Sequence, residues 1–600
     1  MTADLSDRTD FDNADRGLLD KLEPGVVTSA DGQVVWDIDA FGRAVQGDRP
    51  DTVNPSLWRQ SQLTAKQGLY QVTDGIYQVR GLDMSNMTLV EGDTGVVVID
   101  PLISQETAAA AIALYRRNRG DRPVSAVIYT HAHIDHFGGV LGVIDADTDV
   151  PIVAPEHFLE HSVSENVYAG GAMLRRGMYY SGDALDESAT GRVGIGLGAA
   201  GSTGTVGLIA PTLDITHTGQ EEVLDGVRIV FQMTPGTEAP AEMNFHFPDR
   251  RALCLAENAT HNLHNLLTLR GAQVRDPRIW SRYLAEAIEL FGADTDVAFA
   301  SHHWPTWGRD NIVAYLTQQR DLYCYLHDQT LRLMNQGLIG TEISDVLQMP
   351  PSLERQWHTH GYYGSVSHNV KAIYQRYLGW YDGNPAHLWQ HPPKETADRY
   401  VKLLGGVDAV LDQAREFAAD GDLRFAAELA SHAVFAAPDN TDATSTLANI
   451  LERLGYGSEC ATWRNCFLSG AWELRNGIKP TAVTAAAGMA PAMTTTQLFD
   501  SIAIRIDGPR AWDLTLSISW NLTDVAEHYR MELSNGALVH YPTTASSATD
   551  LTITLTRPQL LRLLFAGDHA GIGFDGDPAV LTTLLELTDT PDPSFPLVTP

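Results

Sequence analysis

Short apolar runs bounded by polar turn residues follow one another from about residue 69 and predict a β-rich opening to the fold. The turns Asp74-Gly75 and Asp93-Thr94-Gly95 are typical of hairpins. The four predicted strands cover residues 69–72, 76–79, 87–90 and 96–99. A helix over 106–118 and a buried strand over 124–129 come next. This order favours an α/β sandwich, in which helices cover the sheets.

Two segments of the N-terminal half lack such a pattern. Residues 1–65 are punctuated by Gly, Asp and Pro and are predicted to form an irregular polar arm. Residues 165–212 are rich in Gly but contain neither pattern of the phosphate-binding loops, so we expect a long loop that lines the active site. Regular patterns then return, with strands over 227–231, 243–247 and 252–255 and helices over 277–291 and 309–336.

The last third of the chain changes character twice. Residues 394–476 are strongly helical, and 407–455 resembles a tetratricopeptide-like helix pair, although one pair does not make a solenoid. Alternating apolar residues return from about 496 and predict strands over 502–506, 514–518 and 551–555, followed by a helix over 557–565. We therefore expect three domains, covering residues 1–345, 346–480 and 481–600.

Composition limits the partners. The chain has 600 residues, with 42 basic against 75 acidic side chains and a formal net charge of −33, so it is expected to repel nucleic acid and anionic membranes. No apolar run approaches the ~20 residues that span a bilayer, and the N-terminus lacks a signal-peptide pattern. We expect a cytoplasmic protein, with a periplasmic or secreted one left open. The four cysteines do not suggest a disulfide scaffold, although Cys460 and Cys466 are close enough in sequence to pair.

Four potential metal ligands follow the strand predicted at 124–129: His131, His133, Asp135 and His136. Neither a core nor an ordinary surface loop needs that density of imidazoles, whereas two neighbouring ions do. Three more candidates stand directly after apolar runs: Glu238, Glu257 and His302. Asp100 also ends a predicted strand, and it has two open roles, orienting the His-rich loop or capping its own loop.

The segment from His131 to His136 resembles the H-x-H-x-D-H signature of the metallo-β-lactamase superfamily. Glu238 stands where a familiar member has His, and Glu257 where it has the bridging Asp. With these two differences the sequence resembles the alkylsulfatase branch of that superfamily. The segments that also resemble this branch are residues 234–243, 255–261, 269–271, 302–308 and 361–369. The resemblance implies an αββα sandwich, then an α-helical dimerisation domain and an α+β sterol-carrier-like domain, in a homodimer.

The same resemblance implies two Zn²⁺ ions. His131, His133 and Glu238 are expected to hold one, and Asp135, His136 and His302 the other, with Glu257 between them. Metal-activated hydroxide then hydrolyses an alkyl sulfate ester to an alcohol and inorganic sulfate. We considered two alternatives: another hydrolase on this fold, such as a lactonase or phosphodiesterase, and a non-catalytic lipid-binding protein.

Substrate contacts are expected from the segments that follow Glu257 and from the second domain. The resemblance places a sulfate-binding arginine at Arg270, whose planar fork suits an oxyanion. His264, and less readily His261, are candidates for the general acid. Helical spacing would put the two about one turn apart, so both could face the cavity. Asn258 and Tyr363, with Tyr362 as an alternative, are further candidates for sulfate binding. Chain-length preference, primary against secondary substrates and the bond cleaved stay open.

Overall fold

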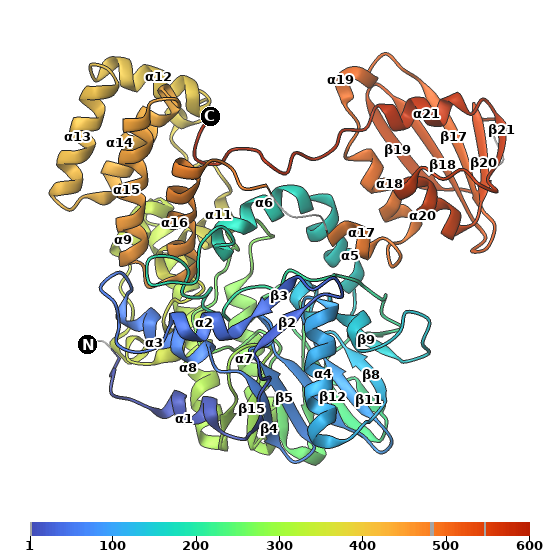
Figure 1. The fold of residues 1–600 in the computed structure, drawn as a ribbon, viewed down its shortest axis with the longest axis horizontal. Helices are drawn as coiled ribbons and strands as arrows, with labels where there is room; N and C mark the ends of the chain where they lie inside the picture. The colour runs from blue at the N-terminus through green and yellow to red at the C-terminus, as the bar shows by residue number, and fades with distance from the viewer. Residues whose placement is uncertain (1–2, 481–484, 545–547) are drawn as a thin grey trace.

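The computed structural model describes residues 3–480, 485–544 and 548–600. Figure 1 shows a sandwich of two sheets in the N-terminal half, a helical bundle above it, and a smaller C-terminal domain to one side. The chain then returns from the C-terminal domain to the bundle, where Arg175 Nε donates to the carbonyl of Phe595 at 3.0 Å. None of the helices in these described ranges combines the length and apolar character needed to cross a bilayer.

The first sheet of the sandwich has eight strands in the order β1-β4-β5-β6-β7-β8-β9-β10. Neighbours are antiparallel from β1 to β7 and parallel from β7 to β10. Helix α4 (Gln105–Arg119) connects β7 to β8. The strands are β1 (Leu18–Asp20), β4 (Gly68–Thr73), β5 (Ile76–Arg80), β6 (Met87–Glu91), β7 (Val96–Ile99), β8 (Val124–Ile128), β9 (Ile152–Pro155) and β10 (Leu213–Ile215).

The second sheet has six strands in the order β11 to β16. These are β11 (Glu221–Leu224), β12 (Val227–Met233), β13 (Met243–Phe247), β14 (Ala252–Cys254), β15 (Val297–Phe299) and β16 (Thr306–Trp307). Apolar side chains of both sheets share one core, including Ile99 and Ile128 from the first and Phe231 and Phe245 from the second. Helices α7 (Pro277–Phe291) and α8 (Arg309–Met334) cover the outer face of the second sheet, which completes four layers.

The prediction that the N-terminal segment before residue 65 forms an irregular polar arm is wrong. Residues 3–65 contain a two-stranded sheet and three helices: β2 (Val26–Thr28), β3 (Val34–Asp37), α1 (Thr9–Asp15), α2 (Ile38–Ala44) and α3 (Pro55–Thr64). Phe11, Phe41 and Trp58 are buried, because these scattered apolar residues pack on distant segments such as the loop around Val193. The segments are too short and too mixed in polarity for sequence periodicity to reveal them.

The predicted long loop is only partly present. Helix α5 (Phe158–Val163) precedes it, its first residues form a π-helical turn η3 (Ser164–Tyr168) and α6 (Gly170–Ser181), and it is irregular only from residue 182 to 212. Helix α6 packs against the bundle helix α16 (Ala461–Asn476) through the buried ion pair of Arg175 and Glu473, 2.5 Å apart. That tertiary contact stabilises a helix whose three glycines weaken its own helical preference.

The prediction that residues 394–476 are strongly helical is confirmed. The main helices of this helical part are α12 (Pro393–Leu403), α13 (Val407–Ala419), α14 (Leu423–Ala436), α15 (Thr441–Gly457) and α16, and small residues such as Ala426 and Ala430 let α13 and α14 pack closely. The preceding helices are α9 (Gly340–Val346), α10 (Pro351–Glu354) and α11 (Val366–Leu378). All four cysteines, Cys254, Cys324, Cys460 and Cys466, are free thiols.

The C-terminal domain is one five-stranded sheet in the order β19-β18-β17-β20-β21, with helices around it. The strands are β17 (Leu516–Leu522), β18 (Glu527–Ser534), β19 (Ala537–Pro542), β20 (Leu551–Leu555) and β21 (Gly573–Gly576). The helices are α17 (Ala485–Met489), α18 (Thr495–Ala503), α19 (Gly508–Ala511), α20 (Arg557–Ala566) and α21 (Ala579–Glu586). The strand predicted at 502–506 is wrong: a capping box of Thr494 and Gln497 starts a helix that includes Ile502.

Candidate metal centre

The loop that follows β8 carries the His-rich motif into the interior. His131 comes three residues after the end of β8 at Ile128, and Asp135 and His136 belong to a single 3₁₀ turn. His131 and His136 are completely buried, while His133 and Asp135 keep a small exposed fraction. Burying so many ionisable groups is unfavourable unless charges or ions compensate them.

Seven side chains form two groups, and within each group the potential ligand atoms lie within 4.8 Å of one another. The first group is His131, His133, Glu238 and Glu257, and the second is Asp135, His136 and His302. Glu257 also lies beside the second group: its Oε2 is 3.4 Å from His136 Nε2 and 3.2 Å from His302 Nε2. All seven residues predicted as ligands are therefore brought together, with Glu257 between the two groups.

Unpartnered polar atoms show that this cluster fits metal ions. Nε2 of His131, His136 and His302 and Oε2 of Glu238 are buried without a hydrogen-bond partner. Buried polar atoms are nearly always hydrogen-bonded, so several orphans in one cluster need an explanation. Imidazole and carboxylate groups are the ligands that Zn²⁺ and related divalent ions prefer.

Hydrogen bonds on the far side of the rings set their direction. Asp100 Oδ2 lies 2.9 Å from His136 Nδ1, and Met84 O lies 3.1 Å from His302 Nδ1, which leaves the Nε2 atoms toward the cluster. Asp100 also accepts hydrogen bonds from the backbone and hydroxyl of Thr130, at 2.9 and 2.8 Å. These contacts of Asp100 are all with the His-rich loop, so they support the first of its two open roles, orienting that loop.

Arg275 and Glu242 belong to the site but were not predicted. Arg275 is 5% exposed and pairs with Glu238, while Glu242 accepts the backbone N–H groups of Glu238 at 3.0 Å and Glu257 at 3.1 Å. Burial, and then the charge of Glu238, raise the pKa of Glu242 to about 8. The apolar neighbours of Glu242 were an available signal, whereas Arg275 stands beside Asp276 and Arg278 in the sequence, and only the folded loops show which residues the two contact.

The two histidines predicted as acids lie in different places. His264 Nε2 is 2.8 Å from Glu257 Oε1, so this ring touches the cluster. His261 is stacked on Trp304 and Tyr315, with ring centroids 4.7 and 5.0 Å apart, and burial lowers its pKa to about 3. The expected helical spacing is wrong, because residues 258–276 contain no helix.

Arg270 lies on the neighbouring wall. Its Nη2 is 2.8 Å from Glu165 Oε2, and the same carboxylate oxygen is 3.6 Å from His133 Nε2. Burial raises the pKa of Glu165, but the charges of Arg270 and His133 outweigh burial and hold it well below its usual range. Arg270 is therefore connected to a member of the first ligand group by one carboxylate.

The remaining predicted contacts divide between this wall and the interior. Tyr363 packs its ring 4.8 Å from His264 and 6.3 Å from Tyr180, beside the Arg270 wall. Tyr362 instead places its hydroxyl 2.9 Å from that of Ser56. Asn258 donates to the Thr234 hydroxyl at 3.1 Å, so its side chain bonds the loop that follows β12 rather than Arg270.

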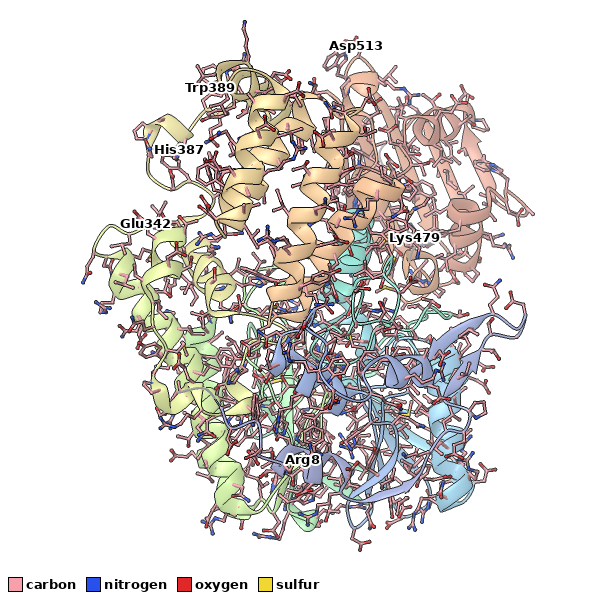
Figure 2. All side chains as sticks on the ribbon, turned by 60° about the vertical axis from the view of Figure 1, so that its left-hand side comes forward. Arg8, Glu342, His387, Trp389, Lys479 and Asp513 are labelled. Carbon is pink, nitrogen blue, oxygen red and sulfur yellow. The ribbon has the colours of Figure 1, made fainter. Side chains whose placement is uncertain are left out.

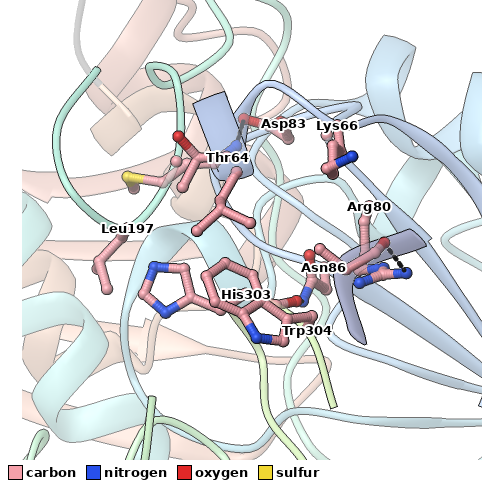
Figure 3. A pocket seen from close by; sticks show the side chains of 13 residues that line it. Thr64, Lys66, Arg80, Asp83, Asn86, Leu197, His303 and Trp304 are labelled. Atoms are coloured by element: carbon pink, nitrogen blue, oxygen red, sulfur yellow. Dashed lines mark hydrogen bonds between the residues drawn. The ribbon is translucent and has the colours of Figure 1, made fainter. Parts of the chain in front are cut away.

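A cavity of about 30 Å³ lies behind the second ligand group (Figure 3). Asn86 Nδ2 donates to the carbonyl of His303 at 2.8 Å on its wall, and Met84, whose carbonyl accepts from His302, also lines it. That volume suits about one water molecule and cannot hold an alkyl chain. Any larger molecule would therefore have to reach the cluster from another side.

Three family models match consecutive parts of the chain: the Metallo-beta-lactamase superfamily over residues 80–302, Alkyl sulfatase dimerisation over 339–477 and Alkyl sulfatase C-terminal over 483–600. A linear primary-alkylsulfatase of Pseudomonas sp. is 46% identical, over 99% of this chain and 90% of the relative. An (R)-specific secondary-alkylsulfatase of Pseudomonas sp. is 43% identical, over 99% and 92%.

Among solved structures, that of the stereoselective inverting secondary alkylsulfatase Pisa1 from Pseudomonas sp. superimposes with a TM-score of 0.96 at 42% identity. The match covers 100% of this chain and 96% of that one. The predicted fold class, an αββα sandwich followed by a helical dimerisation domain and an α+β domain, is confirmed.

Proposed function

The chain belongs to the alkylsulfatases of the metallo-β-lactamase superfamily, and from this premise we propose that it hydrolyses alkyl sulfate esters with two bound zinc ions. The products are an alcohol and inorganic sulfate. The observation that carries the proposal is the buried cluster of seven potential ligands, in which Nε2 of His131, His136 and His302 and Oε2 of Glu238 have no hydrogen-bond partner. Two divalent ions bound there would lower the pKa of water to about 7 and so supply the nucleophile at neutral pH.

Residue roles in the metal site follow the two groups. His131, His133 and Glu238 would hold one ion, and Asp135, His136 and His302 the other. Glu257 would serve both, since its Oε2 is 3.2–3.4 Å from His131, His136 and His302. Its second oxygen is held by His264 at 2.8 Å, which fixes the orientation of the carboxylate.

Arg270 would bind the sulfate group. Its side chain is 20% exposed, Glu165 holds one end of the guanidinium, and Gly271 O accepts from Nη1 at 3.0 Å. The remaining N–H donors of the fork suit the oxygens of an anionic ester. Tyr363 is the further candidate for sulfate contact, because its ring lies 4.8 Å from the ring of His264, which touches the ligand cluster through Glu257.

His264 is the better of the two proposed proton donors to the leaving alcohol. It contacts Glu257, whereas His261 packs between aromatic rings away from the two ligand groups. The apolar C-terminal domain remains a proposed sterol-carrier-like holder of the alkyl chain, with a purely structural cap as the alternative. Domain boundaries at 345 and 480 and a cytoplasmic location also stay predictions.

Metal analysis combined with sulfate release from dodecyl sulfate tests the proposal. We expect two zinc ions per chain and stoichiometric release of sulfate and dodecanol. Protein purified without metal and unable to bind zinc would remove the mechanism. Zinc-loaded protein that releases no sulfate from any alkyl sulfate would favour the lactonase or phosphodiesterase alternative.

We also propose a homodimer formed by the helical part. The match to the alkyl sulfatase dimerisation family supports it, as do apolar side chains on its surface. Trp380, Trp389 and Leu403 are 78%, 97% and 80% exposed, and Figure 2 shows Trp389 at the outer end of this part. Large exposed apolar groups of this kind mark interaction surfaces. Sedimentation of W389D should show a lower dimer fraction than wild type, and unchanged sedimentation would count against this surface.

A further inference from the structure

Arg275 is one of the few arginines of this acidic protein that are almost fully buried. It comes two residues before α7, next to the N-cap residue Asp276, and its backbone N–H donates to the carbonyl of Leu266 at 2.9 Å. Asp276 caps the helix through the N–H groups of Arg278 and Ile279, at 2.9 and 3.2 Å, and pairs with Arg376 at 2.9 Å. The arginine is thus held on a rigid support, which is what a group that positions others requires.

The guanidinium of Arg275 binds one carboxylate oxygen of Glu238 and leaves the other without a hydrogen bond. Nη2 of Arg275 donates to Glu238 Oε1, and its Nε donates to the backbone carbonyl of the same residue. Glu238 Oε2 has no hydrogen-bond donor and lies 2.7 Å from His133 Nδ1 and 3.3 Å from His131 Nε2. One oxygen is bound by the arginine, and the other is left for the metal side.

Charge makes this division necessary. Glu238 is 2% exposed, and two further buried carboxyl groups, those of Glu257 and Glu242, lie in the same loop cluster. A buried carboxylate without a partner is strongly unfavourable, and a neighbouring carboxylate makes it more so. A neutral histidine at position 238 would bring no such charge, so the glutamate needs a cation that a histidine ligand does not need.

Arg275 also reaches the second carboxylate ligand indirectly. Its Nη1 lies 2.9 Å from the carbonyl of Asn265 and 3.2 Å from His264 Nδ1. The other nitrogen of His264 lies 2.8 Å from Glu257 Oε1. The same guanidinium therefore stands behind both carboxylates of the first ligand group, on the side away from the histidine ligands.

We infer that Arg275 is a positioning residue that enables Glu238 to act as a metal ligand, by neutralising its charge and holding the oxygen that does not face the ion. The inference rests on the metal part of the proposed function and is independent of the substrate. Arg275 and Glu238 form one unit in this view: the arginine is required because the ligand is a glutamate.

The test measures zinc content by mass spectrometry and zinc affinity by competition with a chelator. R275M removes the charge at similar length, and R275K keeps the charge but loses the fork. R464M is the matched control, because Arg464 is also fully buried but donates only to the backbone carbonyls of Thr52, Ala189 and Gly191. The double variant E238H/R275M replaces the charged pair with a neutral ligand.

We expect R275M to lose about 10- to 100-fold in affinity for the zinc ion of the first ligand group, which contains Glu238; this is the usual effect of removing an outer hydrogen-bond partner of a ligand. R275K should lose less, R464M should bind as wild type, and E238H/R275M should recover at least half of the loss. Folded R275M with wild-type affinity would overturn the inference, as would a double variant no better than R275M. If R275M does not fold, the comparison of R275K with E238H/R275M decides in the same way.

This test separates two failures. Wild-type protein that binds two zinc ions but releases no sulfate contradicts the proposed activity and leaves the role of Arg275 intact. Wild-type protein that hydrolyses alkyl sulfates, together with an R275M variant of unchanged metal affinity, contradicts the inference alone.

Discussion

Replacing Arg270 with Met should weaken the hydrolysis of alkyl sulfates far more than it disturbs the metal site. The guanidinium offers the sulfate group charge-assisted hydrogen bonds, each worth about 1.5–3 kcal/mol. Loss of one such bond corresponds to a fall of about 10- to 150-fold in kcat/KM, because 1.4 kcal/mol is a factor of ten. The variant also leaves Glu165 without its partner at 2.8 Å, so its charge then repels an anionic substrate.

A double variant separates these two contributions. R270M/E165Q lacks the arginine but also lacks the unpaired carboxylate, so we expect it to be more active than R270M and less active than wild type. R176M is the matched control, because Arg176 Nη2 donates to the carbonyl of Leu269, next to Arg270, at 2.9 Å. Initial rates of sulfate release, with zinc content measured on the same samples, give the comparison. Zinc-loaded R270M with wild-type kcat/KM would refute the assigned role.

Other predictions concern protons and the C-terminal core. Burial lowers the pKa of His133, but Glu238 and Glu165 outweigh it and raise the pKa to about 10 in the metal-free protein. His133 must lose that proton to bind metal, so zinc uptake at pH 8 should release at least one proton, and zinc affinity should rise with pH. Calorimetry in buffers of different ionisation enthalpy measures this release. An observed binding enthalpy that is the same in every buffer would contradict the prediction. W520A should destabilise the C-terminal domain by about 3–5 kcal/mol, since Trp520 is fully buried there. An unchanged free energy of unfolding in urea would contradict this.

The predicted ligands share a feature that sequence reveals well. Glu257 and His302 each follow an apolar run within three residues, and such runs became β14 and β15, which are parallel neighbours. The carboxyl ends of neighbouring parallel strands meet at one edge of a sheet, so side chains just beyond them converge. The His-rich loop after β8 reaches the same place from the first sheet, with His131 bridging to Glu242.

Contacts made by irregular segments were not predictable in the same way. Residues 258–276 have no periodicity, so nothing in the sequence indicated that Arg275 would face Glu238 while His261 would face Trp304. The prediction for the segments before residue 65 failed for a related reason: short helices gain their stability from tertiary packing rather than from their own sequence pattern. Local propensity predicts helices and strands, but the partner of a buried charged side chain is known only from the complete fold.

A charge count connects the Arg–Glu pair to the substrate. The ligand set has four neutral histidines and three carboxylates, Asp135, Glu238 and Glu257, which leave one positive charge when two divalent ions are bound. Arg275 adds a second, the buried carboxylate of Asp100 beside His136 offsets it, and Arg270 and Glu165 cancel each other. A hydroxide nucleophile then brings the site to neutrality, and an alkyl sulfate adds a single negative charge. A phosphate monoester carries a second negative charge near neutral pH, so this arrangement favours the sulfate ester over it.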